Sequence, residues 1–255
     1  MEVLNIKNLT KVYGSKSGGI KYTALHDINL MVEEGEFLAV MGPSGSGKTT
    51  LLNVISTIDK PTSGTVLVDG KDIAKLKEPK LSSFRREKLG FIFQNFNLLD
   101  TMTLKENIVL PLSLANVSYK TVQSRLEELS LKIGIKNVLN KYPYEVSGGQ
   151  RQRAAVIRAI ITEPSLILGD EPTGALDSKS AKEVLNCLDE LNNNKATILM
   201  VTHDAFAASY CKRVVFIKDG KLFNEIYRGD KTRTDFYENI LKILSVIGGD
   251  NSDIG

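Results

Sequence analysis

A glycine-rich stretch that ends in a lysine and two threonines is the part of the sequence with the clearest chemical meaning. Residues 42–49 read GPSGSGKT and match G-x-x-x-x-G-K-[ST], after an apolar run and before a segment with helical spacing. The glycines let backbone N–H groups converge on phosphate oxygens, Lys48 reaches the β and γ phosphates, and Thr49 offers a hydroxyl to Mg²⁺. A glycine-rich turn without a ligand is the alternative, and the complete pattern in this context disfavours it.

Two adjacent carboxylates follow another short apolar run. Residues 166–169 read LILG and lead directly to Asp170 and Glu171, at the end of a predicted strand. Open α/β sheets bind ligands at this end of their strands, so we expect Asp170 to hold Mg²⁺ and Glu171 to orient or deprotonate an attacking water. Taken alone, an Asp-Glu pair at a strand end is more often a solvated turn, but the phosphate-binding pattern favours the catalytic interpretation.

Three further residues could contact a nucleotide if the fold brings them close to the phosphate-binding loop. Gln94 follows the apolar run LGFIF and either senses nucleotide or is an ordinary loop residue. His203 ends the run ILMVTH, at a strand end where phosphate would lie. Tyr13 follows an N-terminal strand and could stack on a base, although an isolated tyrosine is usually a packing residue.

A second anion-binding pattern occurs far along the chain. Residues 146–153 read VSGGQRQR and directly precede a segment with helical spacing. Ser147, Gly148 and Gly149 would then form a helix N-terminus with exposed amides and a hydroxyl, which can bind an anion. A helix cap without a ligand is the alternative.

The elements that position these residues alternate between short buried strands and amphipathic helices, which predicts an α/β fold with a mostly parallel sheet. Asp-Gly pairs inside 65–73 and 213–223 predict tight antiparallel hairpins beside that sheet. From about residue 95 to 160 no strand pattern occurs, and Val122, Leu126, Leu129 and Ile133 share one helical face, so this segment is predicted to be an inserted helical subdomain.

Composition limits the classes of function. The chain has 255 residues, 42% apolar and 25% charged, and its 33 basic residues are interleaved with 30 acidic ones, so charge alone does not suggest nucleic acid. Cys187 and Cys211 lack metal-ligand spacing and are expected to be free thiols in a reducing compartment. The sequence shows no secretory signal and no run of about 18 apolar residues, so a membrane role would require a partner.

Taken together, these motifs resemble the ATP-binding subunit of ABC transporters over nearly the whole chain. The family's elements have counterparts in the expected order: the phosphate loop (Gly42, Pro43, Ser44, Gly45, Ser46, Gly47, Lys48, Thr49 and Thr50), the Q-loop (Gln94), the signature (Ser147, Gly148, Gly149 and Gln150), the acidic strand end (Asp170 and Glu171), the D-loop (Ala175, Leu176 and Asp177) and the switch histidine (His203). The one departure is Val146, where the family most often has leucine.

The resemblance implies a P-loop NTPase with a RecA-like core, an antiparallel β subdomain and a helical subdomain, using ATP and Mg²⁺. Two cassettes face each other head to tail, so the phosphate loop of one and the signature of the other enclose each ATP. Lys48 and Mg²⁺ offset phosphate charge, Glu171 polarises water, His203 contacts the γ phosphate, and Gln94 completes the arrangement of metal and water. Thr49, Gln94 and Asp170 are the implied metal ligands, and Tyr13 the implied base contact.

The implied organisation is a single cassette over residues 1–234, with the core and β subdomain at about 1–94 and 161–227 and the helical subdomain at about 95–160. Residues 235–255 form a C-terminal helix and a loose tail. In the helix, Phe236, Ile240 and Leu244 share a face that either packs back onto the cassette or contacts a partner. The implied partners are a second copy and an integral membrane permease, with the cassette on the cytoplasmic face of the membrane and no nucleic acid.

Two stretches indicate a branch of the family. FQNFNLLDTMTLKENIVLPL and DEPTGALDSKS are similar to macrolide exporters, lipoprotein-release ATPases and peptide-antibiotic resistance systems. The C-terminal segment is similar to Bce-type cassettes, which implies resistance to antimicrobial peptides or sensing of them; macrolide or lipoprotein export is the alternative. A soluble ATPase acting on nucleic acid is disfavoured because the chain has no coiled-coil arm, and a small-molecule kinase would have no use for the signature.

Overall fold

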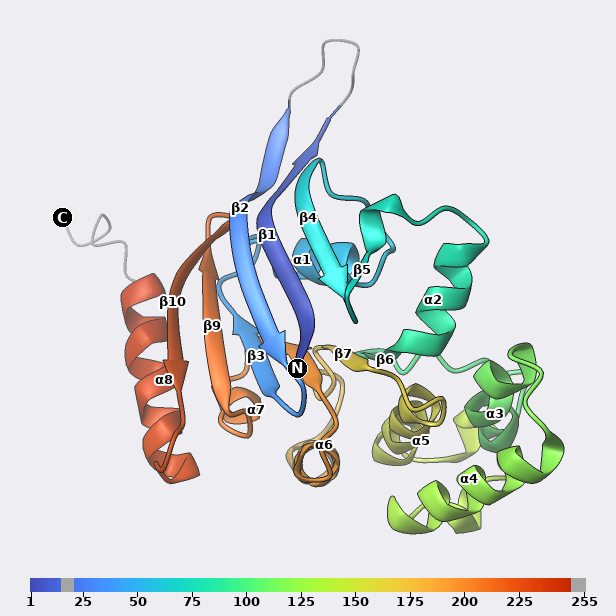
Figure 1. Ribbon diagram of the computed structural model, residues 1–255. Helices are drawn as coiled ribbons and strands as arrows, with labels where there is room; N and C mark the ends of the chain where they lie inside the picture. The colour runs from blue at the N-terminus through green and yellow to red at the C-terminus, as the bar shows by residue number, and fades with distance from the viewer. Residues whose placement is uncertain (15–20, 249–255) are drawn as a thin grey trace.

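The computed structural model of the protein describes residues 1–14 and 21–248, which form two β-sheets with helices around them (Figure 1). Within these residues, the larger sheet has six strands in the order β10-β9-β3-β8-β7-β6, and the smaller has four in the order β2-β1-β4-β5. The fold is α/β with a mostly parallel main sheet, as the sequence predicts.

The larger sheet brings the ends of several strands to one edge. Its strands are β3 (Phe37–Met41), β6 (Leu89–Phe93), β7 (Leu166–Asp170), β8 (Ile198–Val201), β9 (Arg213–Lys218) and β10 (Lys221–Tyr227). All pairs are parallel except β10 with β9. Parallel strands end at the same edge, so the residues that follow β3, β6, β7 and β8 gather there.

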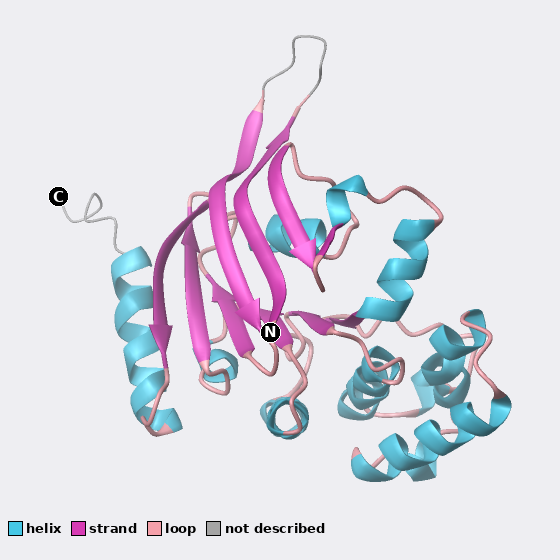
Figure 2. Cartoon of the chain, in the orientation of Figure 1, coloured by secondary structure: helices cyan, strands magenta, loops and turns pink. Residues whose placement is uncertain are grey.

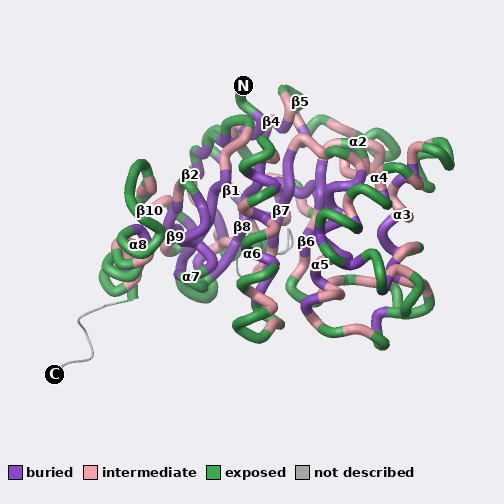
Figure 3. The backbone as a smooth tube through the Cα atoms, turned by 90° about the horizontal axis from the view of Figure 1, so that it is seen from below, coloured by how far each residue is buried: buried purple, intermediate pink, exposed green. Residues whose placement is uncertain are grey.

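This sheet is buried on both faces, as the purple strands in the middle of Figure 3 show. All five residues of β3 are buried. Phe37, Ala39 and Met41 belong to a core shared with α5 and α6, whereas Leu38 and Val40 belong to a second core shared with α1 and the smaller sheet. Alternate residues point to opposite faces, so a strand covered on both sides has a continuous apolar run.

The smaller sheet is antiparallel and consists of β1 (Glu2–Tyr13), β2 (Tyr22–Glu33), β4 (Ser63–Val68) and β5 (Lys71–Asp72). Both predicted hairpins are confirmed, at β4–β5 and β9–β10. Asp69 and Gly70 have φ of 50° and 72°, and Asp219 and Gly220 have φ of 49° and 74°. Two consecutive positive φ angles are characteristic of the type I′ turn, which Asp-Gly favours.

The helices pack outside the sheets. They are α1 (Lys48–Ile55), α2 (Lys80–Lys88), α3 (Leu104–Leu114), α4 (Tyr119–Lys132), α5 (Gly148–Ile160), α6 (Ser178–Asn193), α7 (Ala205–Ala208) and α8 (Arg233–Gly248), with short 3-10 turns at Ile73–Lys75, Lys136–Val138 and Pro143–Glu145. Helix α2 was not predicted from the sequence, because it buries only Leu81 and Phe84 and therefore lacks a strong apolar period.

Helices α3, α4 and α5 form a group beside β6 that contains no strand (Figure 2). On α4, Val122 and Leu126 are buried, as is Ile133 just beyond it, while Leu129 is partly buried. The predicted helical face is therefore confirmed. Helix α5 contacts β6 as well as α3, so it connects the helical group to the main sheet.

Helix α8 packs back onto the cassette. Phe236, Ile240 and Ile247 are buried, and Leu244, which was predicted to share this face, is half-buried. The helix begins two residues before the predicted start at Asp235. Residues 249–255, where a loose tail was predicted, lie outside the described residues.

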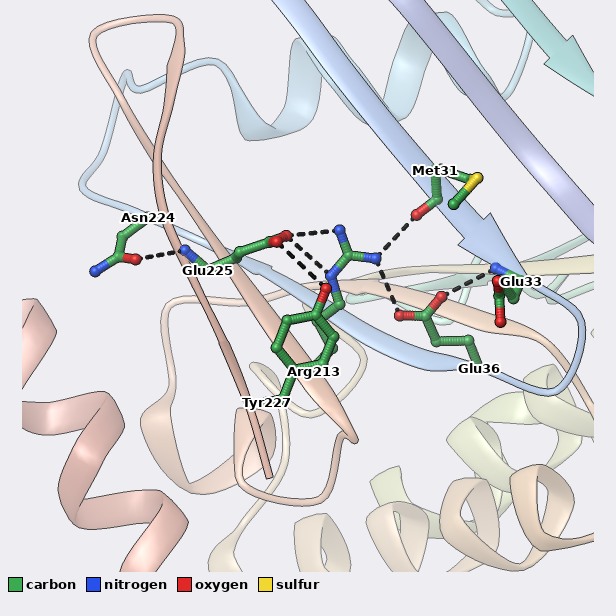
Figure 4. Close-up of polar contacts among 7 residues, drawn as sticks. All are labelled: Met31, Glu33, Glu36, Arg213, Asn224, Glu225 and Tyr227. Carbon is green, nitrogen blue, oxygen red and sulfur yellow. Dashed lines mark hydrogen bonds and ion pairs between the residues drawn. The ribbon is translucent and has the colours of Figure 1, made fainter. Parts of the chain in front are cut away.

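Arg213, the first residue of β9, fastens the two sheets together (Figure 4). Its guanidinium donates to the Met31 carbonyl at 2.9 Å, to Glu36 at 3.2 Å and to Glu225 at 2.7 and 3.1 Å. The Tyr227 ring lies against it, 5.4 Å from the ring centre. The fork of guanidinium donors can bind partners in several directions, so a single side chain connects β2, the turn before β3, and β10.

Both cysteines are free, as predicted, and burial raises the pKa of Cys187 to about 12, which keeps its thiol protonated. In residues 1–14 and 21–248, no group of three or more His, Cys, Asp or Glu residues could hold a metal ion. Nor does any helix in that part of the chain have the length and apolar character needed to cross a bilayer.

Candidate active site

The predicted phosphate-binding and catalytic residues come together at the carboxyl edge of the main sheet. Strand β3 leads into the phosphate loop, β6 into Gln94, and β8 into His203, while Asp170 ends β7. Asp170 pairs in register with Phe93 of β6 and Val201 of β8. Segments that are far apart in the sequence therefore end side by side.

The phosphate loop has a backbone that only glycine can adopt at two positions. Gly42 and Gly47 have φ of 155° and 105°. A Cβ on Gly42 would lie 2.1 Å from the Ile217 carbonyl oxygen, and one on Gly47 would lie 2.6 Å from the Ala24 carbonyl oxygen. Helix α1 begins directly after Gly47 without a side-chain cap, so its first amides point toward the loop. This arrangement is suited to binding an anion.

Two side chains of the loop fit a phosphate ligand. The Lys48 ammonium donates to the carbonyls of Gly42 and Pro43, both at 2.8 Å, and burial lowers its pKa while Glu171 and Asp170 act in the opposite direction. The hydroxyl of Ser46 is buried and finds no hydrogen-bond partner among the described residues. A buried hydroxyl without a partner is costly, and phosphate oxygens would satisfy it.

A hollow of about 200 Å³ adjoins the loop, and one of its lining residues, Tyr22, was not among the predicted site residues. Tyr22 pairs across the strands with Tyr13, so both side chains lie on one face of the sheet. The Tyr13 hydroxyl donates to Asp59 at 2.7 Å, while the Tyr22 hydroxyl lies 3.5 Å from the Gly45 carbonyl oxygen. Only the apolar-to-polar alternation of β2 could have indicated Tyr22, and register shifts interrupt that alternation.

The acidic pair is held in two different environments. Burial and the neighbouring Glu171 raise the pKa of Asp170, and Lys48 opposes this shift. Glu171 has a φ of 47°, which is uncommon for a residue other than glycine. Its carboxylate accepts from the His203 backbone N–H at 3.1 Å and from the Thr202 hydroxyl at 3.3 Å. The end of β8 therefore orients Glu171.

His203 lies closer to Glu171 than the sequence indicated. Its Nδ1 is 2.7 Å from a Glu171 carboxylate oxygen, and 72% of its side chain is exposed. A contact of His203 with the γ phosphate stays a prediction. Thr202, which supports the same carboxylate, was not among the predicted residues.

Gln94 lies against the loop that follows Glu171. A Cβ on Gly174 would lie 2.8 Å from the amide nitrogen of Gln94. The implied Mg²⁺ ligands, Thr49, Gln94 and Asp170, offer hard oxygen atoms and one carboxylate. Mg²⁺ usually takes one or two carboxylates together with substrate phosphates, so this donor set suits the ion.

The signature segment forms a capped helix start that is packed against its own D-loop. The Ser147 hydroxyl accepts from the Gln150 N–H at 3.3 Å, and the Gln150 side chain accepts from the Ser147 N–H at 3.1 Å. A Cβ on Gly148 would lie 3.3 Å from the Leu176 side chain, and one on Gly149 would lie 2.9 Å from the Ser180 hydroxyl oxygen. The glycines therefore allow a close approach of α5 to α6.

The D-loop residues have different surroundings. Ala175 is exposed, and Leu176 is half-buried beside the signature. Asp177 caps α6 by accepting from the N–H groups of Lys179 and Ser180, both at 3.0 Å, and these bonds lower its pKa. None of the signature or D-loop residues lines the hollow beside the phosphate loop.

Known proteins resemble this chain over most of its length. The profile of a family described as ABC transporter matches residues 25–174. The chain belongs to the ABC transporter family. Members of this family with matching motifs bind and hydrolyse ATP, so the protein is an ATP-binding and ATP-hydrolysing subunit of an ABC transporter.

Three relatives cover most of the cassette. The chain is 56% identical to the ABC transporter ATP-binding protein YxdL of Bacillus subtilis, over 99% of this chain and 97% of that protein. The chain is 50% identical to the bacitracin export ATP-binding protein BceA of Halalkalibacterium halodurans, over 99% of this chain and 100% of that protein. The chain is also 40% identical in sequence to the ATP-binding cassette MJ0796, whose dimeric post-hydrolysis structure bound to ADP and Pi has been solved. The TM-score is 0.78, over 88% of this chain and 98% of that chain.

Proposed function

We propose that the cassette forms an ATP-driven dimer that powers a separate integral membrane permease in resistance to antimicrobial peptides or in sensing them. The observation that carries this proposal is the division of the anion-binding groups. Lys48, Asp170 and Glu171 share one edge of the main sheet, whereas Ser147 and Gly148 line a different surface at the start of α5. One copy thus contains parts of two sites.

In the proposed site, the residues at the sheet edge neutralise and position the reacting groups. Thr49, Asp170 and Gln94 would hold Mg²⁺, which would supply positive charge at the phosphates. Lys48 offsets the charge of the β and γ phosphates. Glu171, oriented by the end of β8, would accept a proton from the attacking water. His203 lies beside Glu171, 2.7 Å away, and would contact the γ phosphate.

The second copy completes the site with its signature. The Ser147 hydroxyl caps the Gln150 N–H and leaves the backbone amides of Gly148 and Gly149 to bind the γ phosphate of ATP held by the partner. Ser147 would add its hydroxyl to these contacts. Loss of phosphate removes these contacts, so hydrolysis would open the dimer. The dimeric form of the MJ0796 cassette supports this arrangement.

The permease would dock in a groove of about 360 Å³ next to the Q-loop, between the helical group and the main sheet. The groove is lined by apolar side chains such as Phe91 and Leu110 and by three arginines, Arg85, Arg86 and Arg158. A helix with apolar and acidic side chains would complement it. Such docking would place the cassette on the cytoplasmic face of the membrane.

The similarity to BceA over the full chain, including α8, supports a peptide antibiotic such as bacitracin as the substrate class. The experiment is to delete the coding sequence from the source cell and to purify the tagged cassette with the permease encoded next to it. We expect increased sensitivity to bacitracin, copurification of the permease, and a change in ATPase rate when bacitracin is added. Altered sensitivity to macrolides alone would favour macrolide export, and copurification with RNA or DNA without a permease would refute the transport function.

A further inference from the structure

A completely buried amide connects the signature helix to the two catalytic segments. Gln152 lies on α5 and has no exposed surface. Its Nε2 donates to the Phe93 carbonyl at 3.2 Å and to the Pro172 carbonyl at 2.5 Å. Its Oε1 is buried without a hydrogen-bond partner in the described part of the chain. A buried oxygen without a hydrogen-bond partner lowers the stability of the fold. The two contacts that Nε2 donates therefore explain why this helix has an amide among its alanines and valine.

The two acceptors are each one peptide away from a residue of the proposed hydrolytic site. Phe93 precedes Gln94, and Pro172 follows Glu171. Strands β6 and β7 are adjacent, and Phe93 and Asp170 form their last ladder pair. The Phe93 carbonyl also accepts from the Phe96 N–H at 3.2 Å. Gln152 connects this carbonyl to that of Pro172, two residues beyond the ladder, and so helps to fix the distance between the two chain segments.

Glu171 needs such external support because its backbone is left-handed, with φ of 47°. Residues in this conformation persist where surrounding contacts hold them in place. The end of β8 holds the Glu171 carboxylate through Thr202 and His203, and Gln152 of α5 binds the carbonyl of the next residue, Pro172.

Two arginines of α5 bind the Q-loop but do not reach Pro172. Arg158 donates to the carbonyls of Phe96, at 2.7 Å, and Asn97. Arg151 lies over the Phe96 ring, 4.7 Å from its centre. These contacts hold the chain after Gln94 against α5. Among the hydrogen bonds between described residues, it is that of Gln152 to Pro172 that connects α5 to the segment carrying Glu171.

We infer that Gln152 is a positioning residue that sets Gln94 and Glu171 relative to each other and to the signature at the start of its own helix. The inference rests on the proposed roles of Gln94 and Glu171 in hydrolysis. It predicts that loss of the Gln152 amide slows the chemical step while leaving ATP binding to the phosphate loop intact, since Gln152 does not line the hollow beside that loop.

The chain contains a matched control at the opposite edge of the sheet. Asn192 is also buried, donates through one nitrogen to two carbonyls, those of Gly35 at 3.0 Å and Ala196 at 2.8 Å, and has an unpartnered Oδ1. These acceptors precede β3 and β8, so they lie at the amino edge, away from the site. Replacing Asn192 removes the same kind of contact without touching a catalytic segment.

The experiment compares Gln152→Met with Asn192→Leu in the full chain, measuring Tm, affinity for a fluorescent ATP analogue, and steady-state kcat. We expect both variants to lose Tm. Only Gln152→Met should lose kcat, by at least about tenfold, with ATP affinity within about twofold of wild type. Equal kcat losses in both variants, or kcat of Gln152→Met within about twofold of wild type, would overturn the inference.

A double substitution separates positioning from general damage. In a Glu171→Gln background, Gln152→Met should cause little further loss of kcat, because both changes act on one group. If the kcat losses of the two single variants multiply in the double variant, Gln152 does not act through Glu171. If Gln152→Met does not fold, Gln152→Asn keeps the amide but shortens its reach, and the same kcat loss is expected. An inactive wild-type protein would instead contradict the proposed function.

Discussion

Replacing Glu171 with glutamine tests the assignment of the general base with little change in shape. The Glu171 carboxylate accepts from the His203 N–H at 3.1 Å and from the Thr202 hydroxyl at 3.3 Å. In Glu171→Gln, the amide oxygen can keep the first contact, and the amide NH₂ can donate to the Thr202 oxygen, which is also an acceptor. The backbone of the site should therefore be preserved, and only the proton acceptor is lost.

The expected loss of kcat in Glu171→Gln follows from removing the general base. A positioned general base typically contributes about 10²- to 10⁴-fold to the rate, which corresponds to roughly 2.7–5.4 kcal/mol in the barrier. Glu171 also raises the pKa of Asp170, so replacing it with a neutral side chain relieves repulsion at the carboxylate proposed to hold Mg²⁺. We therefore expect kcat to fall by about 10²-fold or more while ATP binding and ATP-dependent dimerisation persist.

The assay measures phosphate release at saturating ATP together with sedimentation of the cassette with and without ATP. Glu163→Gln is the control, since Glu163 is an exposed carboxylate paired with Arg125 at 2.9 Å, outside the site. Its kcat should stay within about twofold of wild type. Turnover of Glu171→Gln within a few-fold of wild type would remove Glu171 from the role of catalytic base.

The remaining predictions concern the phosphate loop, the signature and Asp170, the carboxylate proposed to hold Mg²⁺. Lys48→Ala should weaken ATP affinity about 10- to 150-fold, the value of a charge-assisted hydrogen bond of about 1.5–3 kcal/mol, and unchanged affinity by fluorescence titration would contradict the phosphate-loop assignment. Ser147→Arg should leave ATP binding to the monomer within about twofold and abolish ATP-dependent dimerisation and hydrolysis; weak binding by the monomer would contradict a site shared between two copies. Asp170→Asn should abolish hydrolysis yet raise the Tm of the nucleotide-free protein. Burial and Glu171 raise the pKa of Asp170, so its ionised form opposes folding. Each kcal/mol of folding free energy regained by removing this charge should raise the Tm by about 2–4 °C. That gain is expected at neutral pH and should disappear as pH falls below the range where a carboxyl titrates in the unfolded chain, which a series of thermal melts would check.

Several features were predictable because their causes are local. The phosphate loop can be read from its glycines, since Gly42 and Gly47 need a backbone that a side chain would block. The Asp-Gly pairs at 69–70 and 219–220 specify their turns for the same reason. Continuous apolar runs indicated β3, β7 and β8, because strands covered on both faces need no polar alternation.

Other features had weaker signals because they depend on distant partners. Strand β2 has the alternating residues Ile28, Leu30 and Val32, but register shifts against β1 interrupt the period over its first half. Helix α2 buries only two apolar residues and is stabilised where it packs on β6. Local patterns predict an element well only when its own residues supply most of its burial.

The sequence by itself determined the phosphate loop, the acidic strand end and the capped signature helix, because each of these depends on residues within a few positions of one another. Only the tertiary structure decided that Tyr22 lines the hollow beside the loop, that Thr202 and His203 orient Glu171, and that Gln152 holds the peptides beside Gln94 and Glu171. These contacts join strands that are adjacent in the sheet but far apart in the chain. The order of strands in the sheet sets them, and no spacing in the sequence records it.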